Sequence, residues 1–359
     1  MQRQMMTEGG KYCIRVSGSL PYYAPVEILD ASLRVNDEVA LYPLYSYFMT
    51  KEWGEPSSDV LPEGDTPVPT HLDITWLSLA EKKIYSAAFP LPQDKLDLLF
   101  KQQDEKRSRP LYEHIVVGMA PYGGVAVWVY GYKSSVLIDW QQATEITVNL
   151  ADYLPVDPEA SIDVYCDYYL NEDEAAMEYL NTNGLPSRHL FDKYMHQFCY
   201  RYLPMFQQWD EESEQWKQLE TDDEAPHPEL DYIQEELYDG THDKLHNDRL
   251  MNYHEAGKPK KLAMQWHMGK KEFTAYVWME DEGICAVFDR FYGNHRDTKV
   301  DFIIRIDPNK KKYQLALYHY GLEEPVTISE DAYQMIVFKD QFEHYRTKNY
   351  DQPRGAWIW

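Results

Sequence analysis

The chain has 359 residues, of which 44% are hydrophobic and 14% aromatic, including 30 tyrosines and 10 tryptophans. This composition supplies enough apolar material for one large domain or two smaller ones and argues against disorder. Lys and Arg number 35 against 60 Asp and Glu, which gives a formal net charge of −25. Because phosphate binding needs a basic surface, we expect no nucleic acid partner. The charge would attract a cationic protein, or it simply keeps the chain in solution.

Four cysteines, Cys13, Cys166, Cys199 and Cys285, are scattered without CxxC spacing. This favours reduced, buried thiols over a disulfide scaffold or a zinc knuckle. The N-terminus has no apolar leader region, and no apolar run approaches the ~20 residues of a membrane span. We therefore expect a cytoplasmic protein without a membrane span, or a periplasmic protein if a leader has been removed.

The first part of the chain is predicted to be rich in strands. Residues 1–60 form an N-terminal β-rich segment, followed by a loop with several prolines and glycines. Residues 65–165 form an α+β unit. In it, apolar residues alternate over 72–89 as in a β-hairpin, Pro92 stands where a helix would begin, and paired glycines turn a second hairpin over 115–131.

Residues 166–256 are predicted to form a helical, acidic middle region. Apolar residues at helical spacing run from Leu190 to Tyr202 and stop at Pro204. Pro228 stands where a further helix would start, and Thr241 is a candidate N-cap for a last helix that extends to about residue 255.

Residues 257–359 show the features of the first unit again, in the same order. Trp266 corresponds to Trp76, and the lysine pair 270–271 corresponds to 82–83. A helical spacing of apolar residues and a second hairpin follow in both places, which favours an internal duplication. We therefore predict an α+β fold with two diverged β-hairpin–helix–β-hairpin units, built on antiparallel sheets and joined by the helical, acidic region.

One histidine pair has the spacing of metal ligands. His242 and His246 are four residues apart, which on a helix places both on one face. A zinc protease would carry glutamate where Asp243 stands, and only His254 or Glu255 is nominally available as a third ligand. Surface histidines explain the spacing equally well. The pair is a weak metal candidate, and we expect no cofactor and no catalytic residue.

The acidic stretch after residue 208 is the candidate partner-binding surface. Its two tryptophans would anchor a partner inside an acidic rim that steers a basic protein, while an ordinary solvated face or loop is the alternative. The candidate residues are Trp209, Asp210, Glu211, Glu212, Glu214, Trp216, Asp222, Asp223 and Glu224.

Several short segments within residues 65–150 carry a family resemblance. They are Leu72-Asp-Ile-Thr-Trp76, Phe89-Pro-Leu-Pro, Tyr112-Glu-His-Ile-Val-Val-Gly118 and Pro121-Tyr-Gly-Gly. They resemble a bacterial family, domain of unknown function 2931, many of whose members are described as lipoproteins. The chain departs from the lipoprotein pattern in lacking a leader and a lipidated N-terminal cysteine. The resemblance implies a companion of contact-dependent or type VI secretion toxins, and it brings no catalytic residues.

These observations lead to one hypothesis and two rivals. The leading hypothesis is a non-enzymatic immunity-type protein that binds and neutralises a cognate toxin or effector with a basic surface. The first rival is an envelope or scaffold module that binds another protein. The second is a metal-dependent hydrolase that uses His242 and His246.

Overall fold

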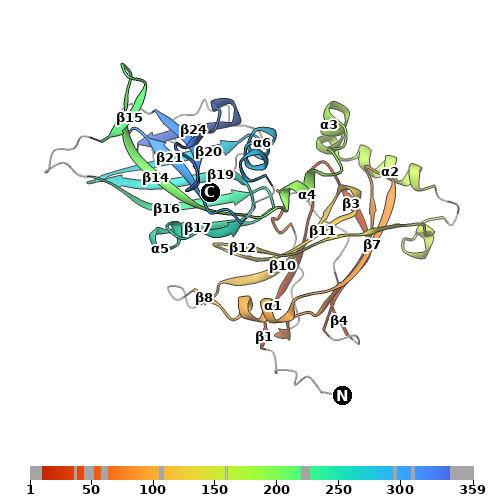
Figure 1. Cartoon of the computed structure of the whole chain (residues 1–359). Coiled ribbons are helices and arrows are strands. Elements are labelled where there is room, and N and C mark those ends of the chain that lie inside the picture. The colour runs from red at the N-terminus through yellow and green to blue at the C-terminus, as the bar shows by residue number, and fades with distance from the viewer. Residues whose placement is uncertain are drawn as a thin grey trace. The chain divides into compact units, whose positions relative to one another are not determined.

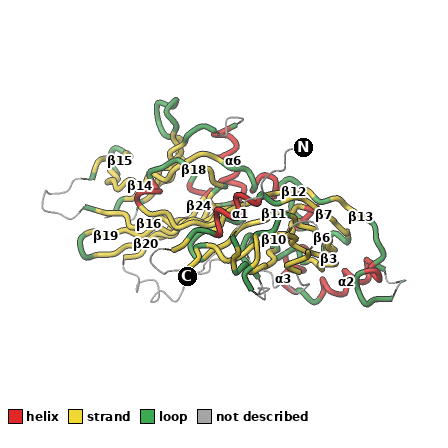
Figure 2. Tube along the Cα trace, turned by 90° about the horizontal axis from the view of Figure 1, so that it is seen from below, coloured by secondary structure: helices red, strands yellow, loops and turns green. Residues whose placement is uncertain are grey.

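The computed structural model separates the chain into two compact units (Figure 1). Unit 1 comprises Met1–His196 and Tyr238–Asp243, and unit 2 comprises Gln197–Leu237 and Lys244–Trp359. Of the residues that the structure describes, 49% are in strands and 20% in helices, so the predicted α+β class is confirmed (Figure 2). The predicted division into four segments stays a prediction. The structure describes residues 10–35, 39–43, 52–57, 64–104, 109–157, 159, 161–219, 227–293, 297–308 and 312–339.

Unit 1 contains two main sheets. The first has the order β12-β11-β10-β2, with β10 antiparallel to β11 and parallel to β2. Its strands are β2 (Arg15–Ser19), β10 (Tyr112–Ala120), β11 (Gly124–Gly131) and β12 (Ser135–Gln142). The second sheet is antiparallel, in the order β13-β7-β6-β3-β4. Its strands are β3 (Val26–Val35), β4 (Val39–Pro43), β6 (His71–Ser78), β7 (Lys83–Pro90) and β13 (Thr144–Ile146).

Helices and short ladders complete unit 1. The helix expected after Pro92 is present, and its apolar side chains Leu96, Leu99 and Phe100 are buried. The helices are α1 (Gln93–Phe100), α2 (Ile162–Asn171), α3 (Glu174–Asn183) and α4 (Leu190–Tyr194), with 3-10 turns η1 (Pro121–Gly123) and η2 (Leu150–Asp152). The short ladders pair β1 (Lys11–Tyr12) with β5 (Thr66–Pro67), and β8 (Gln103–Asp104) with β9 (Arg109–Pro110).

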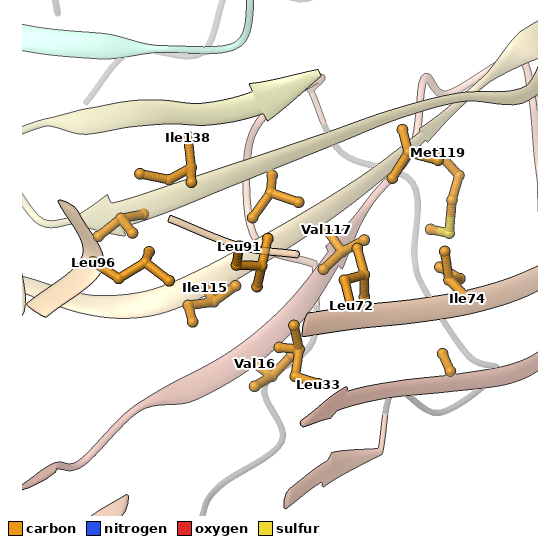
Figure 3. Close-up of a cluster of buried hydrophobic side chains, with 14 of the residues drawn as sticks. Val16, Leu33, Leu72, Ile74, Leu91, Leu96, Ile115, Val117, Met119 and Ile138 are labelled. Atoms are coloured by element: carbon orange, nitrogen blue, oxygen red, sulfur yellow. The ribbon is translucent and has the colours of Figure 1, made fainter. Parts of the chain in front are cut away.

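The main core of unit 1 lies between its two sheets (Figure 3). Alternation along β6 sends Leu72 and Ile74 into this core and Leu77 to the other face of the sheet. On that other face, Leu77 packs in a second cluster with Cys166 of α2. The outer face of the β10-β11 sheet is covered too, because Trp128 packs with Met195 just after α4. Both sheets are therefore apolar on both faces.

One carboxylate joins the turn after β6 to the turn after β10. The Glu81 side chain accepts hydrogen bonds from Ser78 Oγ at 2.9 Å and from the Tyr85 hydroxyl at 2.8 Å. It also accepts from the backbone N–H of Tyr122 at 2.9 Å. Tyr122 has φ 63°, a left-handed conformation that costs a non-glycine residue free energy. The bond from Glu81 helps to offset that cost and holds the Pro121–Gly124 turn in place.

A segment distant in sequence completes unit 1. The Asp239 carbonyl accepts a hydrogen bond from Trp128 Nε1 at 3.0 Å, and the His242 N–H donates to Ser135 Oγ at 2.9 Å. Gly54 and Gly240 approach so closely that a Cβ on Gly54 would lie 2.1 Å from the Gly240 carbonyl oxygen. Both glycines have positive φ, so neither position tolerates a side chain.

Unit 2 also contains two main sheets. The first has the order β15-β14-β21-β22-β23, with β18 also paired to β14 and β14 parallel to β21. Its strands are β14 (Phe198–Asp210), β15 (Gln215–Gln218), β18 (His254–Ala256), β21 (Val300–Ile306), β22 (Tyr313–Tyr318) and β23 (Val326–Thr327). The second, β17-β16-β19-β20-β24, contains β16 (Pro228–Leu237), β17 (His242–His246), β19 (Pro259–Met268), β20 (Lys271–Met279) and β24 (Tyr333–Lys339). The helices are α5 (Asn247–Leu250) and α6 (Asp281–Tyr292), with the 3-10 turn η3 (Glu330–Ala332).

The two units share an order of strand pairing. The order β4-β3-β6-β7-β13 has its counterpart in β17-β16-β19-β20-β24, and the parallel pair β2–β10 has its counterpart in β14–β21. Buried Trp76 faces Tyr85 across its hairpin, as buried Trp266 faces Phe273. One sheet in each unit is thus mixed rather than wholly antiparallel, because β2 and β14 each join a strand that is distant in sequence. The internal duplication itself stays a prediction.

The helical prediction for the middle region is correct only as far as Tyr194. Residues 198–210 form β14 instead, where Phe198, Tyr200 and Tyr202 are buried in alternation. The spacing of Phe198 and Tyr202 also fits a helix, but burial of Tyr200 between them fits only a strand. Pro204 lies within β14 and does not end it.

Two further predicted helices are also strands. Pro228 begins β16, along which Ile233, Glu235 and Leu237 are buried in alternation. The predicted helix after Thr241 is wrong, because residues 242–246 form β17 and only Asn247–Leu250 form a short helix. Cross-strand pairing and burial therefore decide these segments over local signals such as an N-terminal proline or a capping threonine.

We predict that Glu81→Gln destabilises unit 1 by about 1–3 kcal/mol, because an amide has one acceptor oxygen for three donors. Urea titrations with hydrogen exchange at amides of β6, β7, β10 and β11 measure the change within this unit. Glu324→Gln, at an exposed residue of unit 2, is the matched control and should stay within about 0.5 kcal/mol of the wild type. Equal effects of the two substitutions would contradict the role given to Glu81.

Candidate functional site

The acidic stretch predicted to bind a partner forms a β-hairpin. Asp210 ends β14, Gln215 begins β15, and the residues between them form the turn. Trp209 pairs with Trp216 across the hairpin, and their rings lie 5.3 Å apart at an interplanar angle of 62°. The predicted residues Asp222, Asp223 and Glu224 lie outside the described part of the chain.

Asp210 builds the turn and differs in this from the glutamates that follow it. Its Oδ1 accepts hydrogen bonds from the backbone N–H groups of Glu212 at 2.9 Å and Ser213 at 3.2 Å. Its Oδ2 pairs with Lys217 on the opposite strand. Asp210 therefore serves the fold, whereas the side chains of Glu211, Glu212 and Glu214 are exposed on the turn. We refer to these three glutamates as the acidic turn.

The tryptophans below the acidic turn are held by the sheet. Both side chains are half-buried. The backbone N–H of Trp209 donates to Oδ2 of the fully buried Asp307 at 2.8 Å. Lys312 Nζ lies 5.2 Å from the centre of the Trp209 ring. These contacts fix the direction of the hairpin, so the acidic turn is presented on a supported base. Such an arrangement suits charge recognition of another molecule.

His242 and His246 do not form a metal site. Both lie on β17 rather than on a helix, and a strand separates residues four apart by ~13 Å. Zinc ligands lie about 2 Å from the ion, so one ion cannot contact both side chains. Within the described segments, no group of three or more His, Cys, Asp or Glu side chains is placed to hold a metal ion. The expectation of a shared helical face is wrong.

The structure instead pairs His242 with Ser135, a residue that no sequence pattern singles out. His242 Nδ1 lies 3.0 Å from Ser135 Oγ, and the histidine ring lies 4.8 Å from that of Tyr130. The same oxygen accepts the backbone N–H of His242, and Ser135 is only 6% exposed. These contacts fix the Tyr238–Asp243 segment. The Ser135 hydroxyl is too deeply buried to act as a nucleophile on a molecule from solution. The two residues lie 107 positions apart, so no local motif could connect them.

Unit 2 contains a second polar group that sequence reasoning missed. The Tyr202 hydroxyl donates to Glu235 Oε2 at 2.6 Å, and His254 Nε2 lies 3.7 Å from Glu235 Oε1. Burial, together with the neighbouring Glu235 carboxylate, raises the pKa of Tyr202 well above its usual value. The phenol therefore stays protonated and keeps the buried carboxylate hydrogen-bonded, which is a structural role.

The four cysteines differ in their environments. None is in a disulfide; Cys166 and Cys285 are buried as expected, Cys199 is half-buried and Cys13 is exposed, contrary to expectation. Burial raises the pKa of Cys166 and of Cys285 to about 12, and burial also raises the pKa of Cys199. Because the thiolate is the reactive form, these three thiols are poor nucleophiles near neutral pH.

We predict that a thiol reagent added to the native protein at about pH 8 modifies Cys13 first, because the other three thiols are shielded and protonated. Cys199 should follow more slowly, and Cys166 and Cys285 should react only when urea unfolds the chain. Absorbance after adding Ellman's reagent measures each phase, and Cys13→Ser should remove the fast one. Rapid modification of Cys166 in the folded protein would contradict the prediction.

Comparisons with known proteins identify one family. The family model described as "Protein of unknown function (DUF2931)" matches residues 4–187, about half of the chain. No curated protein matches the chain, and no solved structure does. Among the helices of the described segments, none has the length and apolar composition needed to cross a membrane.

Proposed function

The chain belongs to this family of unknown function, and we propose that it is a bacterial immunity-type protein that performs no chemistry. It would bind a cognate secreted toxin or effector through its own surface and block that protein's activity. The observation that carries the proposal is the acidic turn, raised on a paired-tryptophan hairpin in a chain of net charge −25. Aromatic residues within a charged rim are typical of protein-binding surfaces.

The hairpin is additional to the strand order that the two units share. In unit 1, β2 has five residues and a short connection leads to β3. At the corresponding place in unit 2, β14 has 13 residues and the chain makes the β15 hairpin before it enters β16. If the units descend from one ancestral unit, as we also propose, this hairpin is an elaboration of unit 2. Binding residues are often found on such additions to a rigid scaffold.

The charge of the acidic turn indicates what kind of partner it suits. Opposite charges accelerate encounter and suppress wrong partners, and exposed charges act over a Debye length of about 8 Å at physiological salt. The proposed partner therefore presents a basic surface to the turn. An envelope or scaffold module is the rival function, and a toxin-like gene directly upstream would favour the immunity role over it. The hydrolase hypothesis loses its support, since its two histidines cannot share a metal ion.

Affinity purification of the tagged, full-length protein from its native host tests the proposal. We expect one protein with a toxin-like domain to co-purify in stoichiometric amount, identified by mass spectrometry. Adding the purified chain should then abolish that protein's activity. Recovery of a toxin whose activity is unchanged by the chain would contradict the immunity function and leave the scaffold function.

We predict that replacing Glu211, Glu212 and Glu214 with lysine slows association with this partner about tenfold or more at low salt. The dependence of the association rate on salt should become flatter, because the attractive charges are removed. Asp210 is left intact because it builds the turn. Stopped-flow or biolayer interferometry measures the rates.

The matched control changes three exposed glutamates elsewhere in unit 2, Glu282, Glu323 and Glu324, to lysine. This variant has the same net charge as the first, so it separates local steering from total charge. Equal association rates for the two variants would show that the acidic turn is not the docking site.

A further inference from the structure

Helix α2 of unit 1 is apolar on two opposite sides. One side carries Cys166 and Leu170, both buried, and Cys166 belongs to the cluster that covers the sheet. The other side carries Val164 and Tyr168, four residues apart, which are 69% and 61% exposed. Residues on a helix follow at about 100° intervals, so these two side chains point away from the core. Core packing therefore does not account for them.

The exposed side of α2 is part of a larger aromatic surface. Tyr169 is 43% exposed, and its ring lies 5.1 Å from that of Tyr168 in an edge-to-face contact. We call Val164, Tyr168 and Tyr169 the α2 face. Single exposed apolar residues are normal, but neighbouring ones on one helix are typical of binding surfaces. Tyrosine is also enriched at such surfaces, since its ring has an apolar body and a polar tip.

The sequence around the α2 face contains no positive charge. Residues 134–187 hold 11 Asp and Glu and no Lys, Arg or His. The acidic residues of this stretch are Asp139, Glu145, Asp152, Asp157, Glu159, Asp163, Asp167, Glu172, Asp173, Glu174 and Glu178.

Two lysines from the β6–β7 turn approach this acidic stretch. Lys82 lies 2.7 Å from Asp167 and 4.0 Å from Asp163, and Lys83 lies 2.7 Å from Glu145. Arg188, just beyond the stretch, acts electrostatically on Lys83, and Asp139 acts on Lys95 of helix α1, so these two cations also lie near it. Four cations do not balance 11 carboxylates, so the stretch that contains the α2 face keeps an excess of negative charge.

We propose that the α2 face is a docking surface for a basic protein whose arginine side chains stack on Tyr168 and Tyr169. The planar guanidinium group pairs with carboxylates and stacks on aromatic rings at the same time, which a lysine ammonium does less well. A membrane with anionic lipids is repelled by this surface, and a second copy of the chain carries the same charge. Because the face lies in unit 1, this proposal stands whether or not the acidic turn of unit 2 binds a toxin.

The test uses the full-length protein and three fluorescein-labelled peptides of equal length. Glycine alternates with arginine in the first, with lysine in the second and with glutamate in the third. Fluorescence anisotropy should show that the arginine peptide binds roughly threefold to tenfold more tightly than the lysine peptide. The glutamate peptide should not bind.

Variants then locate the preference for arginine. Tyr168→Ala combined with Tyr169→Ala should abolish the difference between the arginine and lysine peptides. Leu98→Ala, at a residue 64% exposed on helix α1 of the same unit, is the matched control and should leave the difference unchanged. Because the Tyr169 ring also lies 4.6 Å from that of Tyr165, Tyr168→Ala alone is the second variant in case the double one unfolds. Circular dichroism and the melting temperature check the folding of each variant.

Three results would overturn the proposal. The first is equal affinity for the arginine and lysine peptides, and the second is a preference for arginine that persists in a folded Tyr168→Ala, Tyr169→Ala protein. The third is a dimer in sedimentation experiments that Tyr168→Ala dissociates, since a second copy would then be the occupant. Lysine at Glu211, Glu212 and Glu214 should leave the arginine preference intact, which separates this surface from the acidic turn.

Discussion

Packing between two sheets is the interaction on which unit 1 depends. Leu72 and Ile74 of one sheet meet Ile115 and Val117 of the other in a single core. Burial of apolar surface stabilises by about 25 cal/mol per Å², so a strand that is covered on both faces is held far more firmly than one at a surface. Strand β10 is such a strand, because Val116 packs in a second cluster on the outer face. The turns and helices around it are positioned by this packing.

Placing the apolar residues inside leaves the negative charges on turns and outer helices. The acidic turn extends from a sheet of unit 2, and α2 lies over a sheet of unit 1. In each case aromatic rings support or adjoin the carboxylates, and the strands beneath fix their direction. Both surfaces combine a rigid base with an exposed charged rim, which is an arrangement suited to recognition of an oppositely charged surface.

The sequence predicts the first hairpin and the first helix of unit 1 well, because the local sequence signals there agree with the pattern of burial. The alternation in 72–89 and the proline before α1 both predict what forms. The prediction from sequence fails over β14, because the spacing of Phe198 and Tyr202 suits a helix as well as a strand. Only the pairing with β21 makes this segment a strand. Charge and two tryptophans select the candidate residues around Asp210 from the sequence, but the hairpin that carries them lies in a region predicted to be helical. The link between Ser135 and His242 depends on tertiary contacts that no local pattern records.

The Tyr238–Asp243 segment has a consequence for synthesis. A ribosome synthesises the chain from the N-terminus onward. The hydrogen bond from Trp128 to the Asp239 carbonyl can therefore form only after more than 100 further residues have been added. By then, all of β14 and β16 has already been made. Unit 1 therefore cannot reach its final state as an independent first half, although N-terminal domains generally fold first. Unit 1 is therefore completed only after part of unit 2 has been synthesised. A ribosome that stalls before residue 239 leaves the indole N–H of Trp128 without its acceptor.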